Sequence, residues 1–217
     1  MTHPRPTGSF VALVTPMNAD GSIDHAGFGD LIDWHAANGT SALLFMGSTG
    51  EVSMLAPEER REIVRRTLAM RRPGVAMWYG CTGNTTDATI EQVRFAAAEG
   101  ADGAIVAAPS YICADNEAIE DYMREVLDAA DLAMGFYNNP PRVKTDLHWS
   151  NLLRLAEHPN MVVLKESTTR VGQVAQLCAA APEMSLMCCC SPNLGLVVPM
   201  MALGGHGTAN MTGNIIP

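Results

Sequence analysis

Short apolar runs alternate with longer segments of helical spacing along the whole chain. The apolar runs are rich in Val, Ile, Leu and Met and lack the regular polar positions of a half-exposed strand, so we expect strands that are buried on both faces. Eight such strands are predicted, at residues 10–15, 42–46, 75–80, 103–108, 132–137, 161–166, 185–190 and 207–211.

The segments between these strands carry helix signals. In the clearest one, residues 56–70, Glu58 and Glu59 stand near the start and Arg65 and Arg66 near the end, an arrangement that complements the helix dipole. Further helices are predicted at residues 25–38, 87–99, 116–129, 149–157, 170–180 and 194–203.

This alternation predicts the α/β class, with a parallel sheet that is covered by helices. Eight β/α units fit a closed barrel better than an open doubly wound sheet, which usually has about five or six strands. No Gly-x-Gly-x-x-Gly turn follows the first predicted strand, which disfavours a dinucleotide-binding fold. We therefore expect a (β/α)8 TIM barrel.

Composition adds the expected domain organisation. With 217 residues, 47% of them apolar, the chain is long enough for one sizeable core, and no Pro-, Gly- or Ser-rich linker divides it. We expect a single barrel domain over residues 1–217. The last predicted strand is followed only by residues 212–217, so the sequence looks truncated before the helix that would cover strand eight.

Charge and cysteine usage exclude several function classes. Asp and Glu outnumber Lys and Arg by 23 to 14, with no basic run, so nucleic acid is not an expected partner. No apolar stretch of about 18 residues and no signal-peptide pattern occur, so we expect no membrane partner and a cytoplasmic protein. Cys188, Cys189 and Cys190 are consecutive, which does not suit a disulfide framework, and no ligand spacing suggests a metal site.

In such barrels, reactive groups follow the carboxyl ends of the strands. Lys165 is one of only two lysines and directly follows an apolar strand segment, so we expect it inside the barrel. Burial lowers the pKa of a lysine, and a neutral amine can attack a carbonyl carbon. The structural alternative is a buried lysine that forms a salt bridge with a neighbouring acid such as Glu166.

Other polar residues follow predicted strands. The turn Gly47-Ser48-Thr49-Gly50 offers hydroxyls and backbone amides that suit a carboxylate, or it is simply a glycine-rich turn whose Ser or Thr caps the next helix. Pro109-Ser110-Tyr111 follows strand four. Tyr137 ends strand five, either beside Lys165 or as a packed ring with a hydrogen-bonded hydroxyl.

Taken in order, these segments resemble the dihydrodipicolinate synthase and N-acetylneuraminate lyase family of class I, Schiff-base lyases and synthases. Their order and spacing extend the match over essentially the whole chain, and the combination is far more specific than any single motif. The motifs are Val14-Thr15-Pro16, Gly47-Ser48-Thr49-Gly50-Glu51, Tyr137-Asn138-Asn139-Pro140, Lys165-Glu166-Ser167-Thr168 and Leu203-Gly204-Gly205-His206-Gly207.

The resemblance implies that Lys165 forms an imine with a 2-oxo acid such as pyruvate, and that Tyr137 transfers the protons. Ser48 and Thr49 match the position that binds the substrate carboxylate. In the synthases, Thr49, Tyr137 and a tyrosine matching Tyr111 form a proton relay, with that last tyrosine supplied by a neighbouring subunit.

The resemblance also implies the remaining site and partners. Arg142 matches the position that binds the carboxylate of the second substrate, aspartate semialdehyde, and Ala209 falls where a backbone carbonyl lines the pyruvate site. The family architecture implies a C-terminal helical extension and a homotetramer. The small-molecule partners are a 2-oxo acid and, in the synthases, an aldehyde, and the imine chemistry requires no metal and no organic cofactor.

One departure leaves alternative functions open. The family generally carries Gly-x-Asp or Gly-Asp-Asp after strand seven, whereas this chain has Ser191-Pro192-Asn193. The leading hypothesis is a synthase or aldolase acting on pyruvate. The alternatives are a dehydratase or deaminase of the same family, acting on a 3-deoxy-2-oxo sugar acid or a hydroxypyrroline carboxylate, and a non-catalytic homologue that binds a 2-oxo acid.

Overall fold

Eight parallel strands close into a barrel in chain order, with β8 hydrogen-bonded to β1. The computed structural model describes residues 3–181, 183–189 and 195–217. The predicted TIM-barrel fold is therefore confirmed. The strands are β1 (Gly8–Ala12), β2 (Ala42–Phe45), β3 (Ala76–Gly80), β4 (Gly103–Ala107), β5 (Met134–Asn138), β6 (Met161–Glu166), β7 (Ser185–Cys189) and β8 (Gly207–Asn210).

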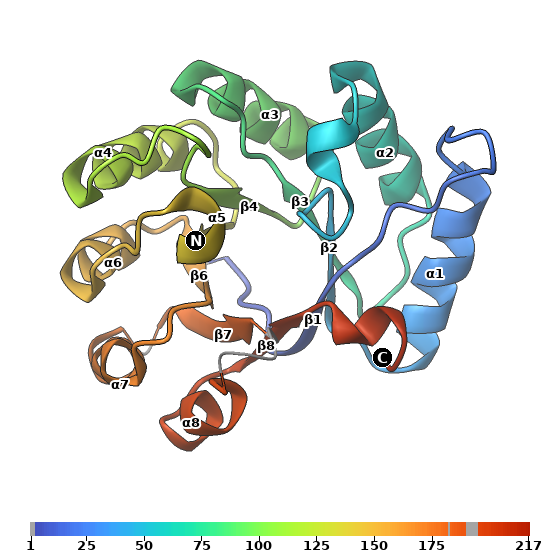
Figure 1. Ribbon diagram of the computed structural model, residues 1–217. Coiled ribbons are helices and arrows are strands. Elements are labelled where there is room, and N and C mark those ends of the chain that lie inside the picture. The colour runs from blue at the N-terminus through green and yellow to red at the C-terminus, as the bar shows by residue number, and fades with distance from the viewer. Residues whose placement is uncertain (1–2, 182, 190–194) are drawn as a thin grey trace.

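Helices surround the ring of strands (Figure 1). All the predicted helices occur, with ends that differ by a few residues, and three short elements, α5, η1 and η2, were not predicted. The helices are α1 (His25–Ala37), η1 (Val52–Met54), α2 (Pro57–Ala69), α3 (Thr86–Ala98), α4 (Asn116–Leu127), α5 (Pro140–Val143), α6 (Trp149–Ala156), α7 (Val171–Ala180), α8 (Val197–Ala202) and η2 (Thr212–Asn214).

Local chemistry explains where several helices begin. Asp24, Thr85 and Asp115 each accept a hydrogen bond from a backbone amide in the first turn of the helix that follows. α5 starts with two prolines, Pro140 and Pro141, whose missing amide hydrogens cost nothing in a first helical turn. This brief helix was not recognisable from periodicity, because its four residues make barely one turn.

Buried apolar side chains form two clusters, as expected when successive strand residues face opposite sides. The larger cluster lies between strands and helices and includes Phe136 and Leu164. The smaller cluster fills part of the barrel interior and includes Phe10, Trp78 and Val163. Each of the eight strands therefore contributes one face to the interior, where a buried polar side chain needs a specific partner.

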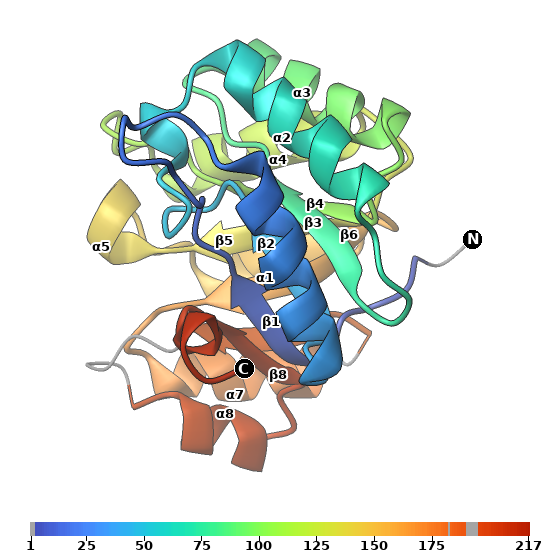
Figure 2. The ribbon, with the colours of Figure 1, turned by 90° about the vertical axis from the view of Figure 1, so that its right-hand side faces the viewer.

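Aromatic rings fill part of the barrel interior, while the carboxyl ends of the strands carry an additional helix. The centroids of the Phe10 and Trp78 rings lie 5.6 Å apart. Gly103 leaves room for the Trp78 ring, since a Cβ at this position would come within 2.5 Å of it. At the carboxyl ends of the strands, α5 projects beyond the barrel, on the side opposite to the N-terminal segment (Figure 2). The residues expected to carry chemistry lie at this carboxyl end.

Within the described ranges, no helix is long and apolar enough to cross a membrane. The cysteines that the structure describes are all free thiols, and Cys188 is buried while Cys113 is exposed. The departure at Ser191-Pro192-Asn193, together with Cys190, lies outside the described residues.

Candidate active site

Lys165 and Tyr137 meet inside the barrel. They are register partners on the neighbouring strands β6 and β5, and both side chains point inward. Lys165 is 4% exposed, and its Nζ lies 4.2 Å from the centroid of the Tyr137 ring. A protonated lysine over the face of a tyrosine is attracted by the electrons of the ring. The prediction that Tyr137 lies beside Lys165 is confirmed.

The Tyr137 hydroxyl lies in a largely buried environment. Burial raises the pKa of this hydroxyl well above its ordinary value, and the nearby Cys189 thiol raises it further, while the Arg142 guanidinium acts in the opposite sense. The Tyr137 Oη lies 3.7 Å from the Cys189 Sγ. The hydroxyl therefore keeps its proton at neutral pH and is able to donate it.

The turn after β2 presents backbone amides at the same end of the barrel. Met46 and Glu51, on either side of residues 47–50, both have a left-handed backbone conformation, which residues other than glycine rarely adopt. The Thr15 hydroxyl donates to the Gly50 carbonyl at 2.7 Å and so fastens the turn to the segment after β1.

Two amides of this turn are available for a ligand. The amides of Gly50, Glu51 and Val52 donate within the turn, whereas those of Ser48 and Thr49 make no hydrogen bond to any described residue. Such a pair can bind a carboxylate. The helix-capping alternative is wrong, because neither of the next two helices is capped by Ser48 or Thr49. Glu51 precedes η1 and makes no side-chain capping bond, and Ala56 precedes α2.

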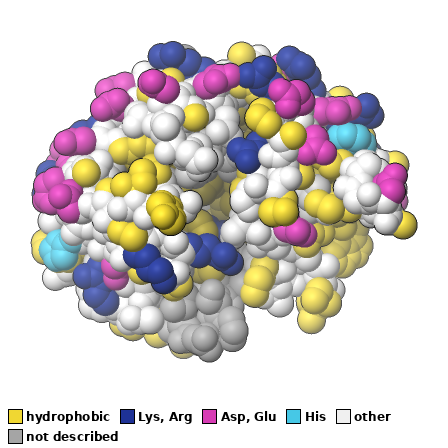
Figure 3. Space-filling model, turned by 45° about the horizontal axis from the view of Figure 1, so that its top comes forward, with side chains coloured by type: hydrophobic (Ala, Val, Ile, Leu, Met, Phe, Trp, Pro, Cys, Tyr) yellow, Lys and Arg dark blue, Asp and Glu magenta, His cyan; other side chains and the backbone are white. Residues whose placement is uncertain are grey.

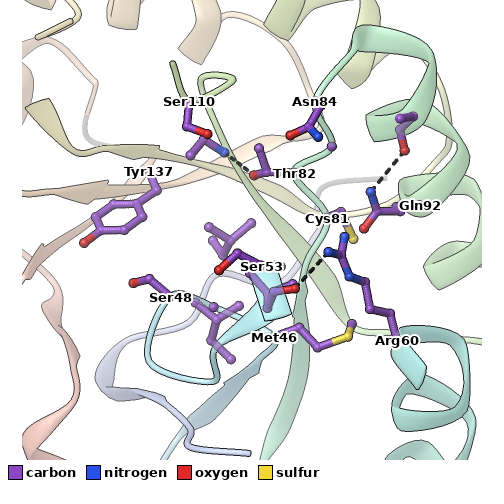
Figure 4. A pocket seen from close by; sticks show the side chains of 18 of the residues that line it. Met46, Ser48, Ser53, Arg60, Cys81, Thr82, Asn84, Gln92, Ser110 and Tyr137 are labelled. Atoms are coloured by element: carbon purple, nitrogen blue, oxygen red, sulfur yellow. Dashed lines mark hydrogen bonds between the residues drawn. The ribbon is translucent and has the colours of Figure 1, made fainter. Parts of the chain in front are cut away.

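A cavity of about 860 Å³ opens at this end of the barrel. The face that carries its mouth is hollowed in the space-filling view (Figure 3). One part of the lining comes from the barrel and the turn after β2, and includes Lys165, Tyr137 and Ser48. The other part runs between α2 and α3, so that Tyr137 and Ser48 lie across the cavity from Arg60 and Gln92 (Figure 4).

Four of the predicted site residues line this one cavity, namely Lys165, Tyr137, Ser48 and Arg142. Arg142 is exposed on α5, and its guanidinium forms no ion pair or hydrogen bond with a described residue. It is therefore able to bind an acidic group that enters the cavity.

The other three predicted residues lie elsewhere. Thr49 is half-buried in the turn but is not among the cavity-lining residues, and Ala209 is buried in the interior cluster, between its register partners Phe10 and Cys189. Tyr111 is 98% exposed, has a φ of 75°, and does not reach the cavity of its own chain.

Glu166 is not the salt-bridge partner of Lys165. It follows Lys165 on β6 and therefore faces the helices, where it accepts hydrogen bonds from the side chains of Asn138 and Gln173 and from the Thr168 amide. The hydrogen bonds between Glu166 and Asn138 beside the site were not predicted from the sequence. The signal was present, since Asn138 follows Tyr137 just as Glu166 follows Lys165.

The comparisons with known proteins agree with this geometry. The model of the Dihydrodipicolinate synthetase family matches residues 5–217. The 4-hydroxy-tetrahydrodipicolinate synthases of Ralstonia nicotianae and Leptothrix cholodnii are 35% and 37% identical over 211 residues, which is 97% of this chain and 71% of each relative.

Solved structures give the same result. Dihydrodipicolinate synthase from Aquifex aeolicus superposes with a TM-score of 0.91 at 29% identity, over 97% of this chain and 71% of that one. The chloride-inhibited dihydrodipicolinate synthase from Acinetobacter baumannii, complexed with pyruvate, superposes with a TM-score of 0.90 at 31% identity, over 97% of this chain and 72% of that one. The chain belongs to the dihydrodipicolinate synthetase family.

Proposed function

We propose that this protein is a Schiff-base synthase that joins pyruvate to aspartate semialdehyde, as the name 4-hydroxy-tetrahydrodipicolinate synthase of its relatives indicates. The observation that carries the proposal is the contact between Lys165 and Tyr137 in a cavity that also presents the Ser48 side chain. A structure of a family member complexed with pyruvate supports the identity of the first substrate.

In this proposal, the Lys165 amine attacks the C2 carbonyl carbon of pyruvate, and loss of water leaves an imine. The protonated imine accepts the electron pair that is left when C3 loses a proton, so the chemistry itself requires no metal or organic cofactor. C3 then forms a bond to the aldehyde carbon, whose oxygen takes up a proton. Attack on the imine carbon by water or by the amino group of the adduct releases Lys165.

The other residues have complementary roles. Tyr137 keeps its proton at neutral pH and donates it to the departing hydroxyl, takes up the proton that C3 loses, and then donates that proton to the aldehyde oxygen. In this proposal the amides of Ser48 and Thr49 bind the pyruvate carboxylate, and the resemblance to the family assigns the Ala209 carbonyl to the lining of the pyruvate site. Arg142 binds the carboxylate of the second substrate through paired hydrogen bonds.

The proposal includes a homo-oligomer, a tetramer by family resemblance. Tyr111 and Ile112 are 98% and 63% exposed at the carboxyl end of the barrel, where a side chain of this size would be buried by a second subunit. In that arrangement Tyr111 reaches the cavity of the neighbouring chain and joins Thr49 and Tyr137 in proton transfer.

Borohydride trapping tests the proposal. Pyruvate and sodium borohydride should leave one covalent adduct, because reduction makes the bond between lysine and substrate permanent, and peptide mapping should place it on Lys165. An adduct confined to Lys144, the only other lysine, would contradict the proposal, as would a folded preparation that forms none with any 2-oxo acid.

One sequence feature favours a second candidate, namely the replacement of the family's acid after strand seven by Ser191-Pro192-Asn193. A dehydratase or deaminase acting on a 3-deoxy-2-oxo sugar acid or a hydroxypyrroline carboxylate would use the same imine. A substrate panel separates the two, since this candidate predicts a best substrate that needs no aldehyde partner.

A further inference from the structure

We infer that Glu166 is a positioning residue, which holds the ends of β5 and β6 in the arrangement that brings Tyr137 and Lys165 together. This inference rests on the proposed function, because it assigns a role in the same reaction to a side chain outside the cavity. Glu166 is 0% exposed and faces the helices, so it cannot touch the substrate.

The carboxylate links the two strand ends directly. Asn138 Nδ2 donates to both Glu166 oxygens, at 3.0 and 3.1 Å, and the Thr168 amide donates to Oε1 at 2.7 Å. In the strand register, Asn138 pairs with Glu166 just as Tyr137 pairs with Lys165. A shift between the strand ends would therefore break the outer pair and move the inner pair by the same amount.

The same hydrogen bonds extend to the loop that follows α5, the helix that carries Arg142. Asn138 Nδ2 also donates to Asp146 Oδ1 at 2.8 Å, and its Oδ1 accepts from the Leu147 amide at 3.1 Å. Asp146 in turn accepts from the Thr168 hydroxyl at 2.9 Å. The chain thus leaves β5, forms α5 and returns to the same group of side chains.

A buried carboxylate is an expensive choice for this position. Leu164, two residues earlier on the same face of β6, belongs to the apolar cluster under the helices, and an apolar side chain would fit that environment at lower cost. A carboxylate accepts several directed hydrogen bonds at once, which an apolar side chain cannot do. What the protein gains at this position is a fixed geometry between three backbone segments.

The test is Glu166→Gln, which keeps the size of the side chain but replaces one acceptor oxygen by a donor that faces Asn138 or Thr168. We expect kcat and the rate of adduct formation with pyruvate to fall between about tenfold and a hundredfold, the scale of a misplacement near 1 Å. The KM for pyruvate should change less than threefold, because the groups that bind its carboxylate are untouched.

Glu120→Gln is the matched control, because Glu120 is also buried, also has several hydrogen-bond donors, and lies on α4 outside the cavity. It should lower the melting temperature and leave kcat within about twofold of wild type. If Glu166→Gln does not fold, Asn138→Ala tests the same link from the other strand, with the same expected split between kcat and KM.

The outcomes separate the two claims. If wild type forms the Lys165 adduct and a folded Glu166→Gln or Asn138→Ala variant keeps kcat within twofold, the positioning role is wrong and the proposed function stands. Equal losses of kcat in Glu166→Gln and Glu120→Gln would also overturn the role, since general loosening would explain both. If wild type forms no adduct, the proposed function fails, and the positioning role fails with it.

Discussion

Two buried glutamates lie in contrasting surroundings. Glu120 belongs to the helical shell, the layer of helices outside the strands, and Glu166 belongs to the mouth of the barrel, the end where β5 and β6 terminate. In the shell, Glu120 on α4 forms ion pairs with two arginines. Its Oε1 lies 2.9 Å from Arg124 Nη2, and its Oε2 lies 2.5 Å from Nη2 of Arg154 on α6. At the mouth, Glu166 accepts its hydrogen bonds from two side-chain amides and one backbone amide, with no arginine among the donors in the described part of the chain.

The pKa values of the two carboxyls move in opposite directions. Hydrogen bonds from Arg154, and then from Arg124 and Asn151, lower the pKa of Glu120 to about 2 in spite of its burial. At Glu166 burial dominates over the hydrogen bonds from Asn138, Thr168 and Gln173 and, with the nearby charge of Asp146, raises the pKa to about 7. The shell carboxylate stabilises helix packing, whereas the mouth carboxylate costs stability when it is ionised.

The largest expected effect at the mouth is that of Lys165→Arg. Turnover should fall to background and the borohydride adduct should disappear, because a guanidinium keeps its proton and cannot attack a carbonyl. Steady-state kinetics, trapping and circular dichroism measure the effect. Lys144→Arg, at an exposed position, is the control and should retain full activity. Substantial turnover by Lys165→Arg would contradict the assignment of the nucleophile.

Tyr137→Phe should fold normally and lose on the order of a hundredfold or more in kcat, the usual scale for a lost general acid or base. The KM for pyruvate should change less. Tyr122→Phe is the matched control in the shell, since the Tyr122 hydroxyl is also buried and bonded to Thr89 at 3.0 Å. A kcat of Tyr137→Phe within roughly threefold of wild type would reduce Tyr137 to a packed ring.

Arg142→Ala should raise the KM for the second substrate at least about tenfold and affect the KM for pyruvate much less, because a hydrogen bond to a charged group commonly contributes about 1.5–3 kcal/mol. Arg154→Ala in the shell is the control, and it should lower stability without changing either KM. Equal effects on both substrates would remove Arg142 from the site. A best substrate without a second carboxylate would favour the dehydratase or deaminase.

The last expected effect concerns the stability of the fold, rather than catalysis, as a function of pH. The folded-state pKa of Glu166 is raised from 4.5 to about 7, so the folded state holds this proton more tightly than the unfolded state. Ionisation of Glu166 therefore lowers the free energy of unfolding. This unfavourable contribution is absent below pH 4.5, grows between pH 4.5 and pH 7, and is constant above pH 7. Relative to Glu166→Gln, wild type should lose on the order of 3 kcal/mol of unfolding free energy between pH 5 and pH 8.

The contribution to the free energy of unfolding has the opposite sign for Glu120, whose folded-state pKa is lowered from 4.5 to about 2. The stability that it contributes is fully present above pH 4.5 and is lost as the pH falls through 2. Wild type and Glu120→Gln should therefore differ by the same amount at pH 5 and pH 8, and should converge only in acid. Urea unfolding at each pH measures both differences, and a flat profile for Glu166 would contradict its assigned environment.

The sequence by itself determined the barrel and the position of Lys165 at the end of an inner strand. Strand and helix periodicity are local properties, and burial on both faces of a strand is written in each apolar run, so eight units and a lysine at the end of β6 could be predicted without coordinates. The short helix α5 escaped prediction because four residues carry no periodicity.

Only the tertiary structure decided which groups surround that lysine. Tyr137 and Lys165 are 28 positions apart in the chain, and their contact depends on the register of β5 against β6, which no local pattern specifies. The same register turns Glu166 away from Lys165 and toward Asn138. Barrel closure and the path of the loops likewise leave Tyr111 outside its own cavity. Contacts between distant segments depend on how whole helices and strands pack together. The local sequence specifies only the type of each element and the side chains on each of its faces.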